Sequence, residues 1–357
     1  MPDMTGGWSL IPGCFMVFAA SALAGLLLTP AAIKLCHKYS IYDHPGGRHK
    51  RHKQPTPILG GTAILLAFWA GILVYLIFNG GAFGEIRESI PYILAGSLLV
   101  YGVGIWDDFK PLSAWAKLIA QALAGMLLYW GGLTVNVISL PILGEISVNG
   151  MGVLINIFWV IALSNALNLI DGLDGLATGV SIIASVTMII IGILFKIDAV
   201  VIISLALLGT LSAFWIFNRY PAKIFMGDSG SLLIGYIFAV ISLVVPIKSY
   251  TTTALLLPLL VLGVPLTETT TSFLRRLAAG KNVMKADRRH IFHILAVAGL
   301  SYRQIIYLFY LSGLFFGFLS VVMLLFGRGP VLTFLLLFIV VIFIIYFILI
   351  ARMRKEK

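Results

Sequence analysis

The chain has 357 residues, of which 60% are hydrophobic and only 11% charged, and its mean hydropathy is +1.04. This much apolar surface exceeds what the core of one soluble domain can bury, so the composition excludes a soluble globular protein and predicts a chain embedded in lipid. The formal net charge of +11 is explained by attraction to anionic lipid at one membrane face, and no nucleic-acid partner is needed.

Apolar runs of about 20 residues, the length that crosses the hydrocarbon core of a bilayer, predict about eleven transmembrane helices. The runs lie near residues 8–34, 57–78, 90–106, 112–130, 152–170, 175–195, 199–217, 229–247, 252–274, 304–326 and 329–350. We therefore expect an all-α polytopic membrane protein in which residues 1–357 form a single integral membrane domain. Lys34 follows the first run and no Lys or Arg precedes it, which argues against a cleaved signal peptide and places the N-terminus outside.

The distribution of basic residues agrees with this topology. Eleven spans that start outside place 21 of the 25 Lys and Arg residues inside, together with all six histidines and eight of the fourteen acidic residues. The C-terminus then lies in the cytoplasm. Alternating Val and Ile residues near 133–149, beside Pro141 and Gly144, predict a small external β-hairpin. Cys14 and Cys36 lie too far apart on one predicted helix to form a disulfide.

Two adjacent carboxylates, Asp107 and Asp108, close the third span at the cytosolic boundary. Charged side chains at this depth are costly and usually mark a functional site. Paired carboxylate oxygens suit Mg²⁺ or Mn²⁺ rather than zinc. The alternative is a helix-terminal pair that is solvated by headgroup water.

Residues 164–179, SNALNLIDGLDGLATG, carry four polar side chains at every third position, namely Asn165, Asn168, Asp171 and Asp174. On a continuous helix such a stripe drifts by about 60° per step, so the four side chains would not share a face. We expect the helix to end in a loop that Gly172 and Gly175 permit, with its backbone open to a ligand. Simple capping of two helices is the alternative.

Residues 225–231, FMGDSGS, place Asp228 at the start of the eighth span. The positive end of a helix favours an anion or a phosphate there. An ordinary Asp N-cap explains the same residue equally well.

Residues 285–299, KADRRHIFHILAVAG, predict an amphipathic helix that lies in the membrane interface. His290 and His293 are three residues apart on neighbouring faces, and no third ligand for zinc lies nearby. Because carboxylates are expected beside them, the two histidines are better interpreted as hydrogen-bond donors to a phosphate. Glu268 falls inside the ninth predicted span, where hydrogen bonding between helices explains it, and Lys53 is explained as a positive-inside anchor.

Carboxylates, histidines and basic residues at one membrane face suit a reaction between the phosphates of a soluble partner and a lipid partner. Transfer of a phosphosugar from a nucleotide diphosphate to a lipid phosphate breaks one diphosphate linkage and makes another, so it is nearly balanced in free energy and needs no ATP site. The enzyme has mainly to position the two anions and offset their repulsion.

Taken together and in this order, the motifs resemble the polyprenyl-phosphate N-acetylhexosamine-1-phosphate transferases of the glycosyltransferase 4 family. The resemblance extends from DHPGGRHKRHKQPTPILGG (residues 43–61) and DDFKPLSAWAKL (residues 107–118) to DRRHIFHIL (residues 287–295). The last motif resembles the GlcNAc-1-phosphate branch, of the WecA/TagO type. It departs from that branch at Phe292, where a third histidine is usual.

The resemblance implies transfer of N-acetylglucosamine 1-phosphate from UDP-GlcNAc to undecaprenyl phosphate, which yields GlcNAc-diphospho-undecaprenol and UMP. This is the first membrane step of cell-envelope glycopolymer synthesis, on the cytoplasmic face of the bacterial inner (plasma) membrane. By the same likeness Asp228 is the catalytic Mg²⁺ ligand, and Asp107 and Asp108 share the metal and acceptor site, one of them as a base or as a covalent nucleophile.

The resemblance also implies roles for the other polar residues. Asn165, Asn168, Asp171, Gly172 and Asp174 bind the nucleotide substrate, Phe225 stacks on uracil, Lys53 and Lys117 neutralise phosphates, and His290 and His293 contact the diphosphate. The expected partners are a UDP-sugar, a polyprenyl phosphate and membrane lipids, and the apolar faces leave room for a homodimer.

Two alternatives stay open from the residues. The donor could be another UDP-HexNAc or UDP-MurNAc-pentapeptide, and the chain could instead be a secondary transporter. Transporters place their coupling groups near the bilayer midplane, on broken helices in two related halves. Here only Glu268 is that deep, and the sequence shows no repeat.

Overall fold

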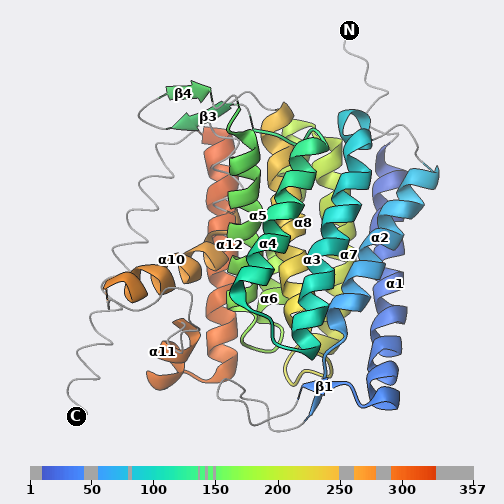
Figure 1. Cartoon of the computed structure of the whole chain (residues 1–357), viewed down its shortest axis with the longest axis vertical. Coiled ribbons are helices and arrows are strands. Elements are labelled where there is room, and N and C mark those ends of the chain that lie inside the picture. The colour runs from blue at the N-terminus through green and yellow to red at the C-terminus, as the bar shows by residue number, and fades with distance from the viewer. Residues whose placement is uncertain are drawn as a thin grey trace.

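The computed structural model describes residues 10–43, 55–78, 83–135, 137–140, 144–147, 150–248, 261–278 and 291–326. Long helices run side by side in one bundle (Figure 1): α1 (Leu10–Tyr39), α2 (Gly60–Phe78), α3 (Ile90–Phe109), α4 (Ala114–Trp130), α5 (Gly152–Ile170), α6 (Leu176–Phe195), α7 (Asp198–Asn218), α8 (Gly227–Lys248) and α12 (Tyr302–Phe326). The remaining helices are the 3₁₀ helix η1 (Gly84–Ser89), α10 (Gly263–Ala278) and α11 (Ile291–Val297).

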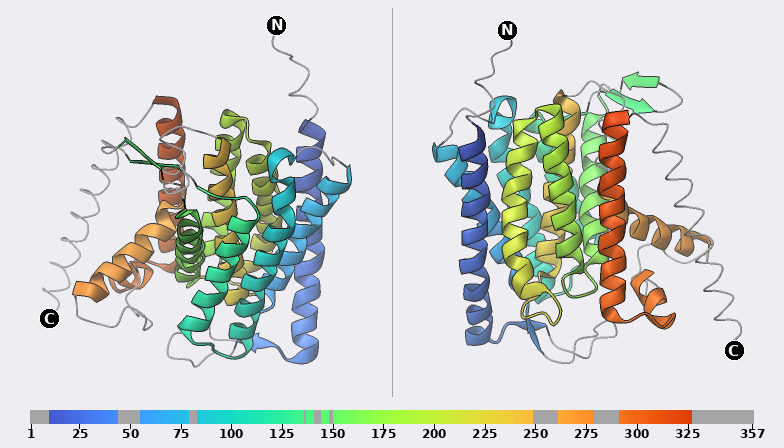
Figure 2. Two further views of the ribbon diagram at one scale, coloured as in Figure 1. Left: turned by 45° about the horizontal axis from the view of Figure 1, so that its top comes forward. Right: turned by 180° about the vertical axis from the view of Figure 1, so that it is seen from behind.

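Eight helices of the described part are long and apolar enough to cross a bilayer, and α4, with 17 residues, runs beside them. The prediction of an all-α polytopic membrane protein is confirmed. The predicted span at 252–274 is described only from residue 261 onward, where α10 crosses the direction of the bundle (Figures 1 and 2). The run at 329–350 lies outside the described residues, so the count of eleven and the orientation stay predictions.

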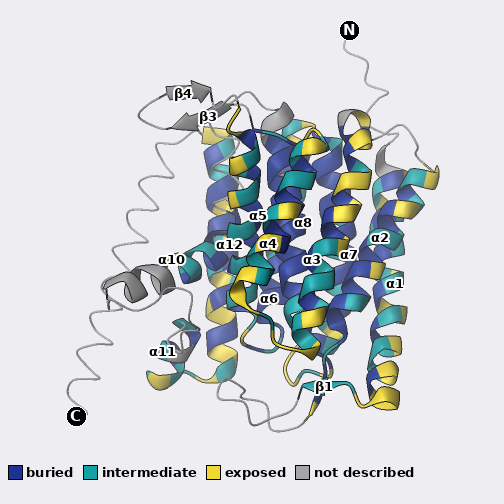
Figure 3. Ribbon diagram, viewed as in Figure 1, coloured by how far each residue is buried: buried dark blue, intermediate teal, exposed yellow. Residues whose placement is uncertain are grey.

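Helix α8 occupies the centre of the bundle, where it packs against α2, α3 and α5. In the most apolar stretch of α8, 94% of the residues are buried, whereas only 22% are buried in the corresponding stretch of α1 at the edge. Figure 3 shows the same gradient from a buried interior to exposed outer faces. Large exposed side chains on those faces, such as Leu27, Ile77 and Phe318, are apolar, as a lipid environment requires. A helix that is apolar on all sides, like α8, is expected to be buried.

Two short antiparallel sheets lie at opposite ends of the bundle (Figure 1). Strands β3 (Val137–Leu140) and β4 (Gly144–Ser147) form the predicted hairpin, with Leu140 paired to Gly144. At the other end β1 (Tyr42–Asp43) pairs with β2 (Thr56–Pro57). The sheet of β1 and β2 links α1 to α2, and its Pro57 carbonyl accepts the backbone N–H of Phe225 at 2.8 Å. The segment before α8 is thereby fixed against the start of α2.

Candidate active site

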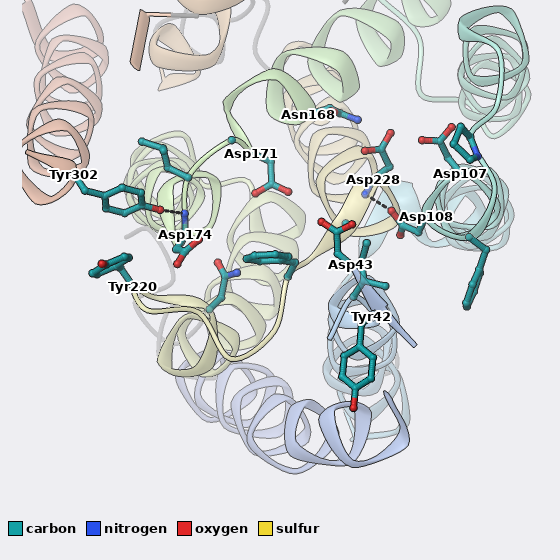
Figure 4. A pocket seen from close by; sticks show the side chains of 18 residues that line it. Tyr42, Asp43, Asp107, Asp108, Asn168, Asp171, Asp174, Tyr220, Asp228 and Tyr302 are labelled. Carbon is teal, nitrogen blue, oxygen red and sulfur yellow. Dashed lines mark hydrogen bonds between the residues drawn. The ribbon is translucent and has the colours of Figure 1, made fainter. Parts of the chain in front are cut away.

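A cavity of about 790 Å³ opens at the end of the bundle where α3 ends and α8 begins. Eight residues that the sequence singled out line it, namely Asp107, Asp108, Asn168, Asp171, Gly172, Asp174, Phe225 and Asp228. They come from the end of α3, the loop between α5 and α6, and the segment that leads into α8 (Figure 4). The structure thus brings Asp107 and Asp108 of one helix end and Asp228 of another to the same cavity.

Asp108 binds the first turn of α8. One of its carboxylate oxygens accepts the backbone N–H of Asp228 at 2.7 Å, and the other accepts the backbone N–H and the hydroxyl of Ser229 at 3.2 and 2.6 Å. Gly227 allows this close approach, because its φ is +69° and an added Cβ would lie 2.5 Å from the Asp108 carboxylate. Asp108 therefore satisfies the free amides of a helix N-terminus from a neighbouring helix.

Lys117 bridges the other two carboxylates. Its ammonium lies 3.1 Å from Asp107 Oδ2 and 2.8 Å from Asp228 Oδ2. The second oxygen of Asp107 accepts the backbone N–H of Leu112 at 2.7 Å, which holds the turn between α3 and α4. One cation thus joins the ends of α3, α4 and α8.

The loop at 171–175 opens between α5 and α6, as the two Asp-Gly pairs predict. Asp171 caps α5 and faces the cavity (Figure 4), and Gly175 starts α6 with a φ of +75°. No hydrogen bond or ion pair from the described residues reaches the Asp171 carboxylate. The pKa of the Asp171 carboxyl is raised well above its ordinary value, first by its deep position and then by the negative charges of Asp228, Asp108 and Asp174.

These carboxylates offer the oxygen donors that Mg²⁺ prefers, and the uncompensated negative charge around Asp171 attracts a cation. In the described part of the chain, however, no three His, Cys, Asp or Glu side chains are placed to bind one ion. The expected ligand set of Asp107, Asp108 and Asp228 is not formed in this arrangement, because Asp108 is turned to α8 and Lys117 lies between the other two. Among the carboxylates that line the cavity, Asp171 is the one that no hydrogen bond or ion pair from the described residues engages.

Several predicted residues lie elsewhere. Asn165 does not line the cavity, because its amide donates to Gln121 Oε1 on α4 and to the Ile161 carbonyl, both at 2.7 Å. Lys53 and His290 lie outside the described residues. His293 belongs to α11, but its side chain also lies outside the described part.

Other lining residues were not predicted. Tyr42 and Asp43 of β1 enter the cavity, and Tyr220 and Tyr302 face each other at its far side, with ring centroids 4.6 Å apart (Figure 4). The sequence could have indicated Asp43 as a site residue, because it begins the basic motif at 43–61 and is one of the acidic residues assigned to the inner side. It could not have indicated the tyrosines, since they lie far apart in sequence and only the fold joins them.

A bundle of apolar helices with a carboxylate-lined cavity at one end defines an integral membrane protein with a polar site at the end of its helices. Residues 90–246, which span α3 to α8 and most of this cavity, match the family model described as Glycosyl transferase family 4.

Three relatives agree with this match. The chain is 33% identical, over 94% of its length and 91% of the relative, to a probable undecaprenyl-phosphate N-acetylglucosaminyl 1-phosphate transferase of Bacillus subtilis. It is 32% identical, over 73% of its length and 71% of the relative, to the decaprenyl-phosphate N-acetylglucosaminephosphotransferase of Mycobacterium leprae. It is 35% identical, over 64% of its length and 72% of the relative, to a phospho-N-acetylmuramoyl-pentapeptide-transferase of Streptococcus thermophilus. The chain belongs to this family of polyprenyl-phosphate sugar-phosphate transferases and is a multi-pass membrane transferase.

Proposed function

We propose that the chain transfers N-acetylglucosamine 1-phosphate from UDP-GlcNAc to undecaprenyl phosphate and releases UMP. The observation that carries the proposal is the convergence of Asp107, Asp108, Asp171 and Asp228 on one cavity at one end of the bundle. A volume of about 790 Å³ is in the range that holds a nucleotide-sized ligand. A lipid phosphate reaches the same depth from the bilayer.

UDP-GlcNAc is proposed as the donor because the relative named for N-acetylglucosamine matches a larger share of the chain than the pentapeptide transferase does. The Bacillus relative, named for undecaprenyl phosphate and N-acetylglucosamine, matches over 94% of the chain, whereas the pentapeptide transferase of Streptococcus matches over 64%. UDP-MurNAc-pentapeptide remains the second candidate donor.

Asp228 and Asp171, with Asp107 nearby, are proposed to hold Mg²⁺, for which Mn²⁺ is the alternative. When bound, the ion supplies positive charge that offsets the repulsion between the two phosphates. Lys117 adds a fixed ammonium at the same place, and His290 and His293 are proposed to contact the diphosphate. Asn168, Gly172, Asp174 and Phe225 are proposed to hold the nucleotide, with Phe225 stacked on uracil.

In the proposed reaction, an oxygen of the lipid phosphate attacks the phosphorus that carries the sugar. A new phosphorus–oxygen bond forms the lipid diphosphate, while the bond to the bridging oxygen breaks and UMP leaves with the electron pair. A phosphate monoester has a second pKa of about 6, so the acceptor is largely a dianion at neutral pH and needs little help from a base. The hydrogen bonds that engage Asp107 and Asp108 favour positioning roles for both residues over a covalent intermediate.

The cavity is proposed to face the cytoplasm of the bacterial inner membrane. Lys110 and Arg219 end α3 and α7 at the cavity end, whereas Arg87 and Lys196 lie at the opposite end. With Lys117 and Lys223, the cavity end carries more basic residues, which agrees with the positive-inside rule.

The test is to purify the full chain in detergent and supply undecaprenyl phosphate, MgCl₂ and one donor at a time. We expect UMP release and a lipid-linked GlcNAc product with UDP-GlcNAc, at a rate well above those with UDP-GalNAc and UDP-MurNAc-pentapeptide. A faster reaction with the pentapeptide donor would reassign the substrate. If no donor releases UMP while proteoliposomes show solute flux, the chain is a transporter.

A further inference from the structure

Two buried side chains outside the proposed chemistry, Glu268 of α10 and Phe292 of α11, hold α11 in place. Glu268 is 1% exposed and Phe292 is 3% exposed. Helix α11 begins directly after His290 and contains His293. What fixes α11 therefore fixes the backbone that carries His293.

Glu268 reaches across from α10 to the first residue of α11. Its two carboxylate oxygens lie 3.0 and 3.2 Å from the backbone nitrogen of Ile291, whose N–H they accept. Burying a carboxylate costs free energy unless the group is hydrogen-bonded. The bonds to the Ile291 N–H therefore favour the conformation in which Glu268 contacts α11. A charged acceptor in an apolar setting defines the position of the start of α11.

Phe292 holds the same helix from the other side, against the loop at 171–175. Its ring lies so close to Gly172 that a Cβ at this position would collide with it. A side chain at position 172 would displace the ring, and Gly172 itself lines the cavity next to Asp171. The position where the family branch usually has a histidine is occupied here by an apolar residue that packs against the loop.

Helix α12 continues from α11 and contacts the same loop at two further points. The Tyr302 hydroxyl accepts the backbone N–H of Asp174, and the Tyr310 hydroxyl donates to the Gly175 carbonyl at 2.7 Å. Helix α11 thus lies between Glu268 on one side and a loop that α12 holds on the other.

We propose that Glu268 and Phe292 are positioning residues, which fix α11, and with it the backbone of His293, relative to the nucleotide loop at 171–175. This role rests on the proposed function, in which the histidines contact the diphosphate of the donor. Neither side chain touches the reacting atoms. Loss of Glu268, whose carboxylate binds the start of α11 and not the nucleotide loop in the described part of the chain, therefore lowers the rate of transfer without weakening binding of the nucleoside monophosphate product.

The first experiment measures amide hydrogen exchange of residues 291–297 in the full-length protein. We expect Glu268→Leu to exchange about tenfold faster there than wild type, and Glu268→Gln, which keeps an oxygen acceptor, to exchange within about threefold. The matched control is Thr269→Val on the same helix, because within the described part of the chain the Thr269 hydroxyl donates only to the Pro265 carbonyl of its own helix. Wild-type exchange in Glu268→Leu would overturn the proposal.

The second experiment compares kinetics. We expect Glu268→Leu and Phe292→Ala each to lower kcat/KM for UDP-GlcNAc about tenfold, while the Kd of UMP changes less than about twofold in Glu268→Leu. In a His293→Ala background, Glu268→Leu should have little further effect, because both changes act through the same helix. Fully additive losses, or an equal loss of UMP affinity, would contradict the positioning role. If the wild type releases no UMP, the proposed function fails, and the exchange experiment alone decides the role of Glu268.

Discussion

The carboxylate of Asp108 on α3 accepts the backbone N–H of Asp228 on α8 at 2.7 Å. This contact joins two parts of the chain that are 120 residues apart and sets the direction of the Asp228 side chain at the head of its helix. Asp108 at the end of α3 therefore stabilises the start of α8, in addition to its proposed role in the active site.

Replacing Asp108 should destabilise the protein through loss of this cap. We expect Asp108→Ala to lower the free energy of unfolding by about 2 kcal/mol, because amides at the start of α8 lose their charged acceptor. Asp108→Asn keeps one oxygen and should lose about half as much. Thermal unfolding in detergent measures the difference, with Glu88→Ala, at an exposed position of η1, as control. Equal stability of Asp108→Ala and Glu88→Ala would refute the capping role.

Lys117 should affect cation binding and catalysis in opposite directions. Lys117→Met removes the ammonium between Asp107 and Asp228, so we expect tighter Mg²⁺ binding, by at least about threefold, and UMP release about 100-fold slower. The control is Lys110→Met, because Lys110 is exposed at the end of α3. Calorimetry with MgCl₂ and the UMP assay measure the two effects. A parallel loss of both would mean that Lys117 only maintains the fold.

Asp171 predicts a pH dependence of stability in the metal-free protein. Its carboxyl pKa is raised in the folded state, so the native chain binds more protons than the unfolded chain, and the free energy of unfolding falls as pH rises above the ordinary value of 3.8. Asp171→Asn removes this contribution. In EDTA, the stability of the variant relative to wild type should therefore increase from about pH 5 to pH 8. A difference that does not change with pH would contradict the raised pKa.

Replacing each of the two asparagines of the α5 motif should have a different effect on the protein. Asn168→Ala should raise KM for the UDP-sugar about tenfold, since Asn168 lines the cavity. Asn165→Leu should leave KM unchanged and lower the melting temperature, since Asn165 pairs with Gln121 between α4 and α5. A raised KM in Asn165→Leu with unaltered stability would restore the sequence-based assignment.

The sequence predicts those features that depend on local pattern. Apolar runs locate the membrane helices, and the Asp-Gly pairs at 171–175 locate the loop that opens into the cavity. The three-residue spacing of the polar side chains in α5 also explains why Asn165 does not line the cavity. A three-residue period drifts around a helix, so Asn168 and Asp171 turn to the cavity while Asn165 turns to α4.

Contacts between distant segments could not be predicted in this way. The strands β1 and β2 have two residues each, too few for a periodic signal, and residues 44–55 separate them in the sequence. The bond from Ile291 to Glu268 depends on how α10 crosses the bundle, which the hydropathy of the chain does not encode. Only the length of the apolar run was visible, and α10 was therefore expected to lie along the bundle.

The most direct test of the central claim is UMP release by Asp228→Asn, with UDP-GlcNAc, undecaprenyl phosphate and MgCl₂ supplied to the intact, folded protein. Asp198→Asn, at the start of α7 and the far end of the bundle, is the matched control. We expect the Asp228 variant to retain less than about 1% of the wild-type rate, EDTA to abolish release by the wild type, and the control to keep full activity. Substantial UMP release by a folded Asp228→Asn protein would show that the phosphosugar is transferred elsewhere.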